Sequence, residues 1–190
     1  MIRCSKCKSN LLFKKTYSGQ IFCTNPKCKY SKGGFFFYQN KPVLIPFGSE
    51  FCIFNNRKQL SLKSSNKNRS NFRLNNLFLK FKNKLGGESK FTKSNYEFLS
   101  KFINQKSKVL FVGGGTKGSG SSYFYNSCKK YSASIEEIDI YNSSNVTAIA
   151  DAHYLPFEDE TFDVIVIQAV LEHVLNPEQV VSEIFRVLVK

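Results

Sequence analysis

Residues 109–118 read Val109-Leu110-Phe111-Val112-Gly113-Gly114-Gly115-Thr116-Lys117-Gly118, an apolar run that passes directly into a cluster of glycines. The apolar run predicts a strand, and the glycines predict a tight turn after it. A turn without Cβ atoms lets backbone N–H groups approach a nucleotide cofactor, and the helix expected beyond it adds a partly positive terminus. The segment therefore indicates the first strand of an α/β domain that binds a cofactor.

The spacing Gly113-x-Gly115-x-x-Gly118 also fits the fingerprint of dinucleotide-binding proteins. Asp139 follows roughly 20 residues later, where that fingerprint has the acidic residue that binds the ribose. The pattern is compatible with any cofactor that contains adenosine, because a carboxylate at this position can bind the ribose of each of them. The glycines alone therefore leave a nicotinamide dinucleotide open as an alternative.

Several short motifs follow one another between residues 151 and 188. They are Asp151-Ala152-His153-Tyr154-Leu155-Pro156-Phe157, Phe162-Asp163, Leu171-Glu172-His173-Val174 and Arg186-Val187-Leu188. In this order they closely resemble the class I S-adenosylmethionine-dependent methyltransferases, and the resemblance covers residues 109–190. It implies a Rossmann-like parallel sheet and the transfer of a methyl group from S-adenosylmethionine.

The resemblance also implies roles for individual residues. Gly113, Gly115 and Gly118 would line the methionine and ribose side of the cofactor, and Asp139 would bind the ribose hydroxyls. Asp151 and the backbone of Ala152 would frame the adenine. The segment from Gln168 to His173 would face the methionine end and the methyl acceptor.

The two histidines leave the catalytic residue open. His173 lies in a matched motif, and a neutral imidazole there could act as a general base. The alternative is that His173 caps or packs against the following loop, and the same alternatives apply to His153. We therefore assign no catalytic residue from the sequence.

The chain departs from the family pattern in three places. Phe111 stands where the family usually has an acidic residue, so the group that holds the cofactor's amino group must come from elsewhere. Residues 140–145 are too few for a helical crossover, which predicts a missing helix or a degenerate third strand. The sequence stops at Lys190, so Val164–Ile167 is expected to form a sheet edge, and we expect a truncated, marginally stable domain from a longer protein.

Four cysteines near the amino terminus have the spacing of a metal site. Cys4 and Cys7 form a C-x2-C pair, and Cys23 and Cys28 form a C-x4-C pair, with fifteen residues between the two pairs. This pattern predicts a structural zinc ion held by four thiolates. Disulfides are the alternative, but they require export, and the amino-terminal sequence is not a secretory signal. We therefore expect a cytoplasmic protein without a transmembrane segment.

The segment after the second cysteine pair reads Gly34-Phe35-Phe36-Phe37-Tyr38-Gln39-Asn40-Lys41-Pro42-Val43-Leu44-Ile45-Pro46. It resembles Trm112-like zinc ribbons, in which an aromatic strand, a turn and a Pro-Val-Leu strand follow the second pair. Such ribbons occur at the front of methyltransferase domains, including some that modify ribosomal RNA. Cys52 and Cys128 lie outside the tetrad and are expected to be ordinary buried thiols.

Residues 51–108 read as a basic linker that contains helices. One amphipathic helix is predicted from Leu74 to Leu85, and a second from Ser94 to Asn104. The second is expected to pack against the methyltransferase sheet, and the first could also lie on a membrane surface or a polyanion.

Charge divides the chain into two parts. Residues 1–108 contain 23 Lys or Arg and 3 Asp or Glu, whereas residues 109–190 contain 5 and 11. A positive field attracts phosphate backbones, so nucleic acid is a possible partner of the first half, although many basic linkers only maintain solubility. The sequence thus predicts a zinc ribbon (1–50), a linker (51–108) and an incomplete methyltransferase domain (109–190). The methyl acceptor, a small molecule or glycan or an RNA, stays open, as does a non-catalytic role for the chain.

Overall fold

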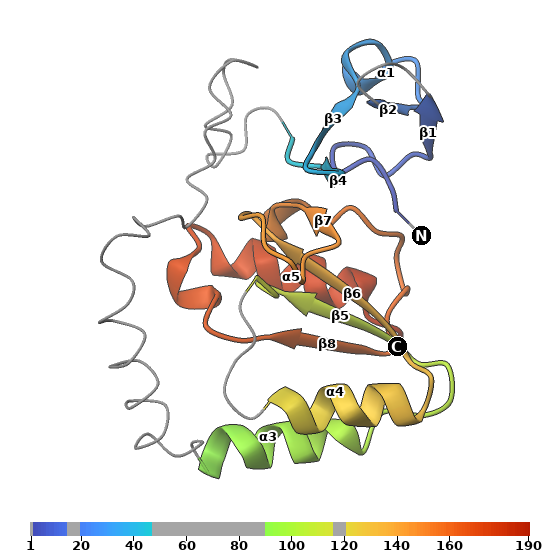
Figure 1. Ribbon diagram of the computed structural model, residues 1–190. Helices are drawn as coiled ribbons and strands as arrows, with labels where there is room; N and C mark the ends of the chain where they lie inside the picture. The colour runs from blue at the N-terminus through green and yellow to red at the C-terminus, as the bar shows by residue number, and fades with distance from the viewer. Residues whose placement is uncertain (1, 15–19, 47–89, 116–120) are drawn as a thin grey trace, which may run out of the picture.

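The computed structural model describes residues 2–14, 20–46, 90–115 and 121–190. Their strands form one sheet in the order β1-β2-β3-β4-β7-β6-β5-β8 (Figure 1). The strands are β1 (Leu11–Lys14), β2 (Gln20–Cys23), β3 (Phe35–Tyr38), β4 (Lys41–Val43), β5 (Lys108–Val112), β6 (Ser134–Asp139), β7 (Ala148–Ile149) and β8 (Val164–Ile167). The helices are α1 (Tyr30–Gly33), α3 (Lys90–Ser100), α4 (Ser121–Lys130) and α5 (Pro177–Val187), with two short 3₁₀ turns, η1 (Ala152–Tyr154) and η2 (Leu171–His173).

Strands β7, β6, β5 and β8 are parallel and are covered on both faces. Alternate residues of β5 point to opposite sides, as the pleat requires. Val109 and Phe111 pack with residues of α3 and α4, whereas Leu110 and Val112 share a core with residues of α5. Figure 1 shows α3 and α4 together below the sheet. The predicted Rossmann-like α/β fold is confirmed.

The connection between β6 and β7 lacks a helix. Residues 140–147 run from one parallel strand to the next without regular structure, and β7 contains only two residues. Both parts of the prediction for this segment, a missing helix and a degenerate third strand, are confirmed. The prediction for Val164–Ile167 is also confirmed, because β8 is the last strand of the described sheet.

The amino-terminal strands do not form a separate sheet. β1 to β4 pair antiparallel in chain order, and β4 then pairs parallel with β7 through Val43 and Ile149. The backbone N–H of Leu44 donates to the carbonyl of Ile149 at 2.8 Å. Strand β4 therefore occupies the place beside β7 that would otherwise be an open sheet edge.

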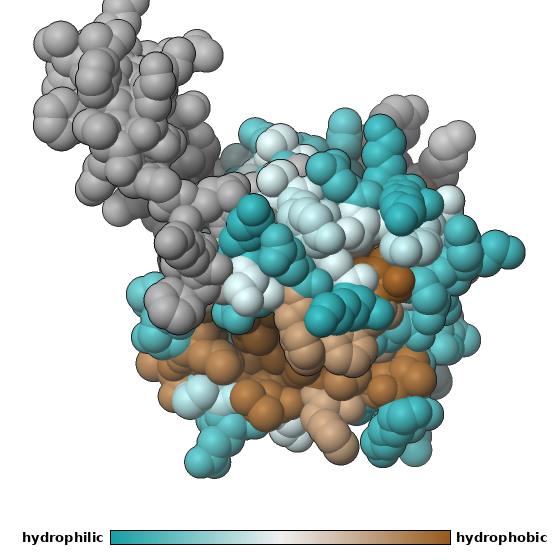
Figure 2. Space-filling model, turned by 90° about the horizontal axis from the view of Figure 1, so that it is seen from below, coloured by the Kyte–Doolittle hydropathy of each residue, from teal (hydrophilic) through white to brown (hydrophobic). Residues whose placement is uncertain are grey.

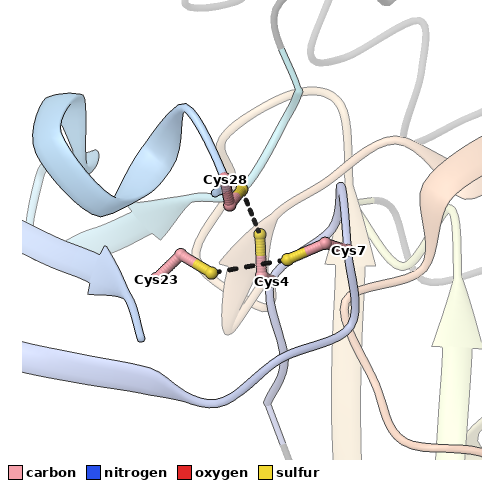
Figure 3. Close-up of side chains that lie close together, drawn as sticks. All are labelled: Cys4, Cys7, Cys23 and Cys28. Carbon is pink, nitrogen blue, oxygen red and sulfur yellow. Dashed lines mark hydrogen bonds between the residues drawn. The ribbon is translucent and has the colours of Figure 1, made fainter. Parts of the chain in front are cut away.

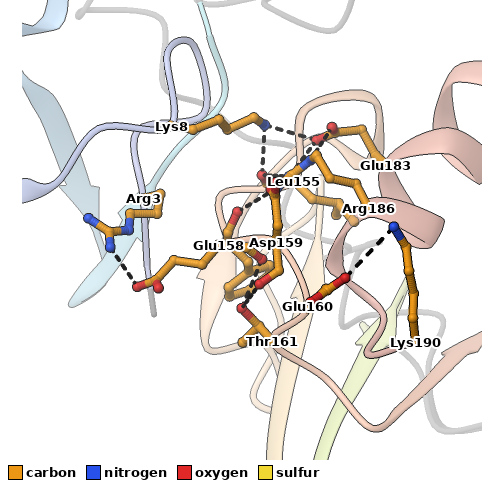
Figure 4. A network of polar contacts seen from close by, with 11 residues as sticks. Arg3, Lys8, Leu155, Glu158, Asp159, Glu160, Thr161, Glu183, Arg186 and Lys190 are labelled. Carbon is orange, nitrogen blue, oxygen red and sulfur yellow. Dashed lines mark hydrogen bonds and ion pairs between the residues drawn. The ribbon is translucent and has the colours of Figure 1, made fainter.

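A second junction ties the ribbon to α5 and to the loop before β8 (Figure 4). Lys8 Nζ donates to the carbonyl of Leu155 and to Glu183 Oε2, both at 2.9 Å. The guanidinium of Arg186 donates to the carbonyls of Leu155 and Phe157 and to Glu183. The arginine of the Arg186-Val187-Leu188 motif therefore anchors this loop, and the ribbon lysine joins the same network.

Helices α3 and α5 follow from local sequence signals. Asn176 Oδ1 accepts a hydrogen bond from Gln179 N at 3.0 Å, and Pro177 occupies the first turn of α5, an arrangement that favours helix initiation. Helix α3 begins and ends about four residues earlier than predicted, and it packs on the sheet as expected. The predicted helix from Leu74 to Leu85, together with Cys52, lies outside the described residues.

The surface combines a charged part with exposed apolar side chains. On α5 and its flanks the exposed apolar residues are Leu175, Val181, Phe185 and Val189. Figure 2, which views the molecule from below, shows apolar side chains gathered in a band beneath a more hydrophilic region. In the part of the chain that the structure describes, no helix has the length and apolar character needed to cross a membrane.

Candidate functional site

A cleft of about 300 Å³ opens at the carboxyl ends of the parallel strands. This is the edge where open α/β sheets bind ligands. Five residues predicted from the sequence line it, namely Gly113, Asp139, Asp151, Ala152 and Gln168. They come from β5, β6, β7 and β8 or from the turns that follow these strands. The structure thus brings together residues that are up to 55 positions apart in the sequence.

Gly113 begins the turn after β5 and forms part of the cleft floor. Its φ is +79°, a conformation that favours glycine. A Cβ at this position would lie 2.3 Å from Val170 Cγ2. The N–H of Gly113 donates to the carbonyl of Ile138 at 2.9 Å. Glycine is therefore required here both by the backbone angle and by the close approach of Val170.

Asp139 ends β6, and its carboxylate is held in a fixed orientation. Oδ2 accepts a hydrogen bond from the N–H of Gly115, and Oδ1 accepts one from the N–H of Tyr141, both at 3.0 Å. A Cβ at Gly115 would lie 2.5 Å from Oδ2. Gly115 does not line the cleft; it makes room for Asp139, which does. Gly118 lies outside the described residues.

Asp151 and His153 form a buried pair next to the cleft. Asp151 Oδ1 accepts a hydrogen bond from the N–H of His153 at 2.9 Å and lies 2.7 Å from Nδ1 of the same ring. The N–H of Asn176 donates to His153 Nε2 at 3.3 Å. In a neutral imidazole Nε2 is then the acceptor, so Nδ1 carries the proton and donates to Asp151. His153 therefore connects the turn after β7 to the start of α5, which is a structural role.

His173 and Gln168 also line the cleft. His173 lines the cleft and is exposed, so a base could reach a substrate from this position. Gln168 Oε1 accepts a hydrogen bond of 2.6 Å from the hydroxyl of Tyr96. Tyr96 belongs to α3, and the sequence analysis did not include it among the site residues. Its place in an apolar helical pattern is typical of a core residue, so no local signal marks it.

A second hollow of about 230 Å³ adjoins the first. Gly113, Gln168 and Ala169 line both. The second hollow extends toward α3 and α4, where Tyr96, Ser121 and Tyr125 line it together with Phe111 and Gly114. The two hollows therefore share lining residues at the glycine turn and at the end of β8.

The four predicted cysteine ligands converge at the ribbon (Figure 3). The sulfurs of Cys4 and Cys28 are 3.8 Å apart, and those of Cys7 and Cys23 are 3.4 Å apart. All four lie within 4.8 Å of one another. Tetrahedral Zn²⁺ with Zn–S bonds of about 2.3 Å requires sulfurs about 3.8 Å apart. The donor set and its spacing therefore fit a zinc ion, and the cysteines are free thiols rather than disulfides.

The thiols of this cluster differ in acidity. Burial raises the pKa of Cys23 to about 11 and also raises that of Cys4. Burial acts in the same direction on Cys7, but hydrogen bonds at Ser9 outweigh it and lower the pKa to about 6. A metal binds thiolates, so the first proton is released most readily at Cys7.

A family model matches the carboxy-terminal part of the chain. Residues 116–190 match the model described as a methyltransferase domain. This range includes Asp139, Asp151 and Gln168, which line the cleft. No curated protein matches the chain.

Several solved structures are similar to this chain at low identity. The MccD protein is 26% identical with a TM-score of 0.41, and the match covers 53% of this chain and 49% of that one. A candidate sarcosine dimethylglycine methyltransferase from Galdieria sulphuraria is 21% identical, with a TM-score of 0.40 and coverage of 51% and 41%. An S-adenosylmethionine-dependent methyltransferase from Aquifex aeolicus is 19% identical, with a TM-score of 0.38 and coverage of 49% and 57%. The chain thus spans about half the length of the structures that it matches.

Proposed function

We propose that this chain, which carries a methyltransferase domain over residues 116–190, binds S-adenosylmethionine in the cleft and transfers its methyl group to a nucleophile. The observation that supports this most directly is the convergence of Gly113, Asp139, Asp151 and Gln168 on one cleft next to the glycine turn. The cofactor would supply an activated methyl group on a sulfonium, which already has a good leaving group. The protein therefore contributes mainly by positioning the reactants.

Each cleft residue has a role that its geometry allows. Asp139 has a fixed carboxylate at the end of the second parallel strand, and we assign it to the ribose hydroxyls. Asp151 and Ala152, at the end of β7, would frame the adenine. Gln168, held by Tyr96, would face the methionine end and the acceptor. Gly115 acts through Asp139, whose orientation it permits.

A calorimetric titration of the zinc-replete chain with S-adenosylmethionine tests this proposal, with NAD as the comparator. We expect saturable binding of S-adenosylmethionine alone. Asp139→Asn should weaken the binding of S-adenosylmethionine by about tenfold or more. The amide has one acceptor oxygen and no charge, whereas the carboxylate offers two charged oxygens to the ribose hydroxyls. Glu160→Gln, an exposed position outside the cleft, is the matched control. Binding of NAD alone, or of neither ligand, would overturn the proposal.

The acceptor that we propose is a small molecule or glycan, or an RNA bound through the basic first half. Exposed lysines on the amino-terminal ribbon support RNA as the acceptor. Lys6, Lys27, Lys29 and Lys32 are exposed, and Phe13 is 60% exposed on β1, so phosphates and bases could both be contacted. Incorporation of labelled methyl into RNA or into small-molecule pools separates the two. RNA binding without S-adenosylmethionine binding would instead favour a non-catalytic binding module.

We also propose that the cysteine cluster holds one structural Zn²⁺. The sulfur spacing supports a tetrahedral ion, and the nearby lysines offset the charge of four thiolates. The ion would fix the turn that presents Lys8 to α5, and so the ribbon would support the methyltransferase domain rather than take part in the reaction.

A further inference from the structure

The strand that precedes the glycine turn lacks a carboxylate, and the neighbouring strand has one at the same level. Phe111 on β5 pairs with Glu137 on β6 in the parallel register. Paired residues of neighbouring strands point to the same face of a sheet. Glu137 therefore lies on the α3–α4 side, beside the position where an acidic residue was expected in place of Phe111.

Glu137 is buried, and its carboxylate is directed at the glycine turn. Its exposed fraction is 7%. The hydroxyl of Tyr125 donates to Glu137 Oε1 at 3.0 Å, and the ring of Tyr125 stacks on Phe111 at 4.9 Å between centroids. A Cβ at Gly114 would lie 3.0 Å from both Cβ and Oε2 of Glu137. Glycine at position 114 therefore leaves room for this carboxylate under the turn.

The neighbours of Glu137 line the second hollow. Phe111, Gly114 and Tyr125 form part of its wall. In the proposed function the ribose and adenine occupy the first cleft, at Asp139 and at Asp151. In that arrangement the amino-acid end of the cofactor would lie beyond Gly113 and Gln168, which line both hollows, on the side of this wall.

We propose that Glu137 supplies the negative charge that holds the ammonium group of the cofactor's amino-acid end, in place of the carboxylate that β5 lacks at Phe111. Tyr125 positions the carboxylate, and Gly114 allows it to approach the turn. This inference rests on the proposed function, because it takes S-adenosylmethionine to be the ligand and its adenosine to lie in the first cleft. Glu137 is buried, and a buried carboxylate attracts an ammonium more strongly than one at the surface.

The test compares two ligands that differ in the amino-acid end. S-adenosylhomocysteine retains it, and 5′-methylthioadenosine lacks it. Calorimetric titrations of the full zinc-replete chain should show that Glu137→Gln weakens binding of S-adenosylhomocysteine by about tenfold or more. Binding of 5′-methylthioadenosine should change by less than about twofold, which also shows that the variant is folded.

Glu136→Gln is the matched control. Glu136 precedes Glu137 on β6 and faces the other side of the sheet, where its Oε2 accepts a hydrogen bond from Thr147 Oγ1 at 2.9 Å. Glu136→Gln therefore removes the same charge from the chain without changing the second hollow. Equal weakening of both ligands by Glu137→Gln would assign Glu137 a structural role and overturn the inference. Unchanged affinity for S-adenosylhomocysteine would also overturn it. If the unaltered chain binds neither ligand, the proposed function itself fails.

Discussion

Lys8 Nζ lies 2.9 Å from Glu183 Oε2, and this contact joins a ribbon turn to the last helix across 175 residues of sequence. Lys8 follows Cys7, and Glu183 lies within α5 beside Arg186. The side chains are 33% and 15% exposed, so both charges are partly removed from water. The amino-terminal strands and the carboxy-terminal domain are therefore joined by one ionic network (Figure 4).

Glu183→Gln is expected to lower the free energy of unfolding by about 1–3 kcal/mol, because Lys8 and Arg186 would lose their shared charged acceptor. Chemical denaturation measures this change. Glu178→Gln, which alters an exposed residue in the first turn of the same helix, should change the value by less than about 0.5 kcal/mol. Equal effects of the two substitutions would contradict a specific role for Glu183.

The same network predicts how stability depends on pH. Burial alone would raise the pKa of Glu183, but hydrogen bonds from Arg186 and Lys8 outweigh it and leave the pKa below its ordinary value. Because the folded pKa is lower than the unfolded one, the contribution is complete above the unfolded value of about 4.3 and is lost as the pH falls through the folded pKa. The difference in stability between the unaltered chain and Glu183→Gln should therefore shrink in acid. A constant difference from pH 7 to pH 3 would show that the charge does not matter.

Removal of zinc is expected to unfold the ribbon, because the binding energy of a structural zinc ion is also folding energy. We expect one zinc ion per chain by elemental analysis, and none after Cys4→Ser. Cys128→Ser, which changes a buried thiol on α4 outside the cluster, should leave the zinc content at one. Zinc that persists in Cys4→Ser at full occupancy would argue against a four-thiolate site.

Gly113→Ala should destabilise the domain by roughly 1–3 kcal/mol and weaken cofactor binding. The added methyl meets Val170 at 2.3 Å, and the φ of +79° is unfavourable for alanine. Gly33→Ala is the control, because a Cβ at Gly33 meets no atom within 4 Å. Thermal unfolding with and without S-adenosylmethionine measures both effects. A Gly113→Ala chain as stable as Gly33→Ala would contradict the geometry of the turn.

The two histidines should respond differently to replacement. His153→Ala removes the imidazole that contacts Asp151 and accepts from the Asn176 N–H, so we expect a loss of about 1–3 kcal/mol in the free energy of unfolding. His173 is exposed, and His173→Ala should change stability by less than about 0.5 kcal/mol. Similar losses for both variants would mean that His173 also has a structural role.

Several features of this protein could be predicted from the sequence because they depend on local patterns. The apolar run before Gly113 specifies a buried strand, and the short segment after Asp139 excludes a helical crossover. The spacing of Cys4, Cys7, Cys23 and Cys28 predicts that the four thiols converge, as they do in the structure, since a tetrahedral ligand set is commonly built from two short-range pairs. The convergence of Asp139 and Asp151 was also predictable, because the carboxyl ends of parallel strands meet at one edge.

Tertiary structure alone decided which residues support these features. No local pattern indicates that β4 pairs with β7, that Lys8 contacts Glu183, or that Tyr96 holds Gln168, because each contact joins segments far apart in the chain. The same holds for Glu137, whose position opposite Phe111 follows from the register of two strands. Sequence periodicity fixes which face of a strand a residue occupies, but only the packed fold determines what it meets there.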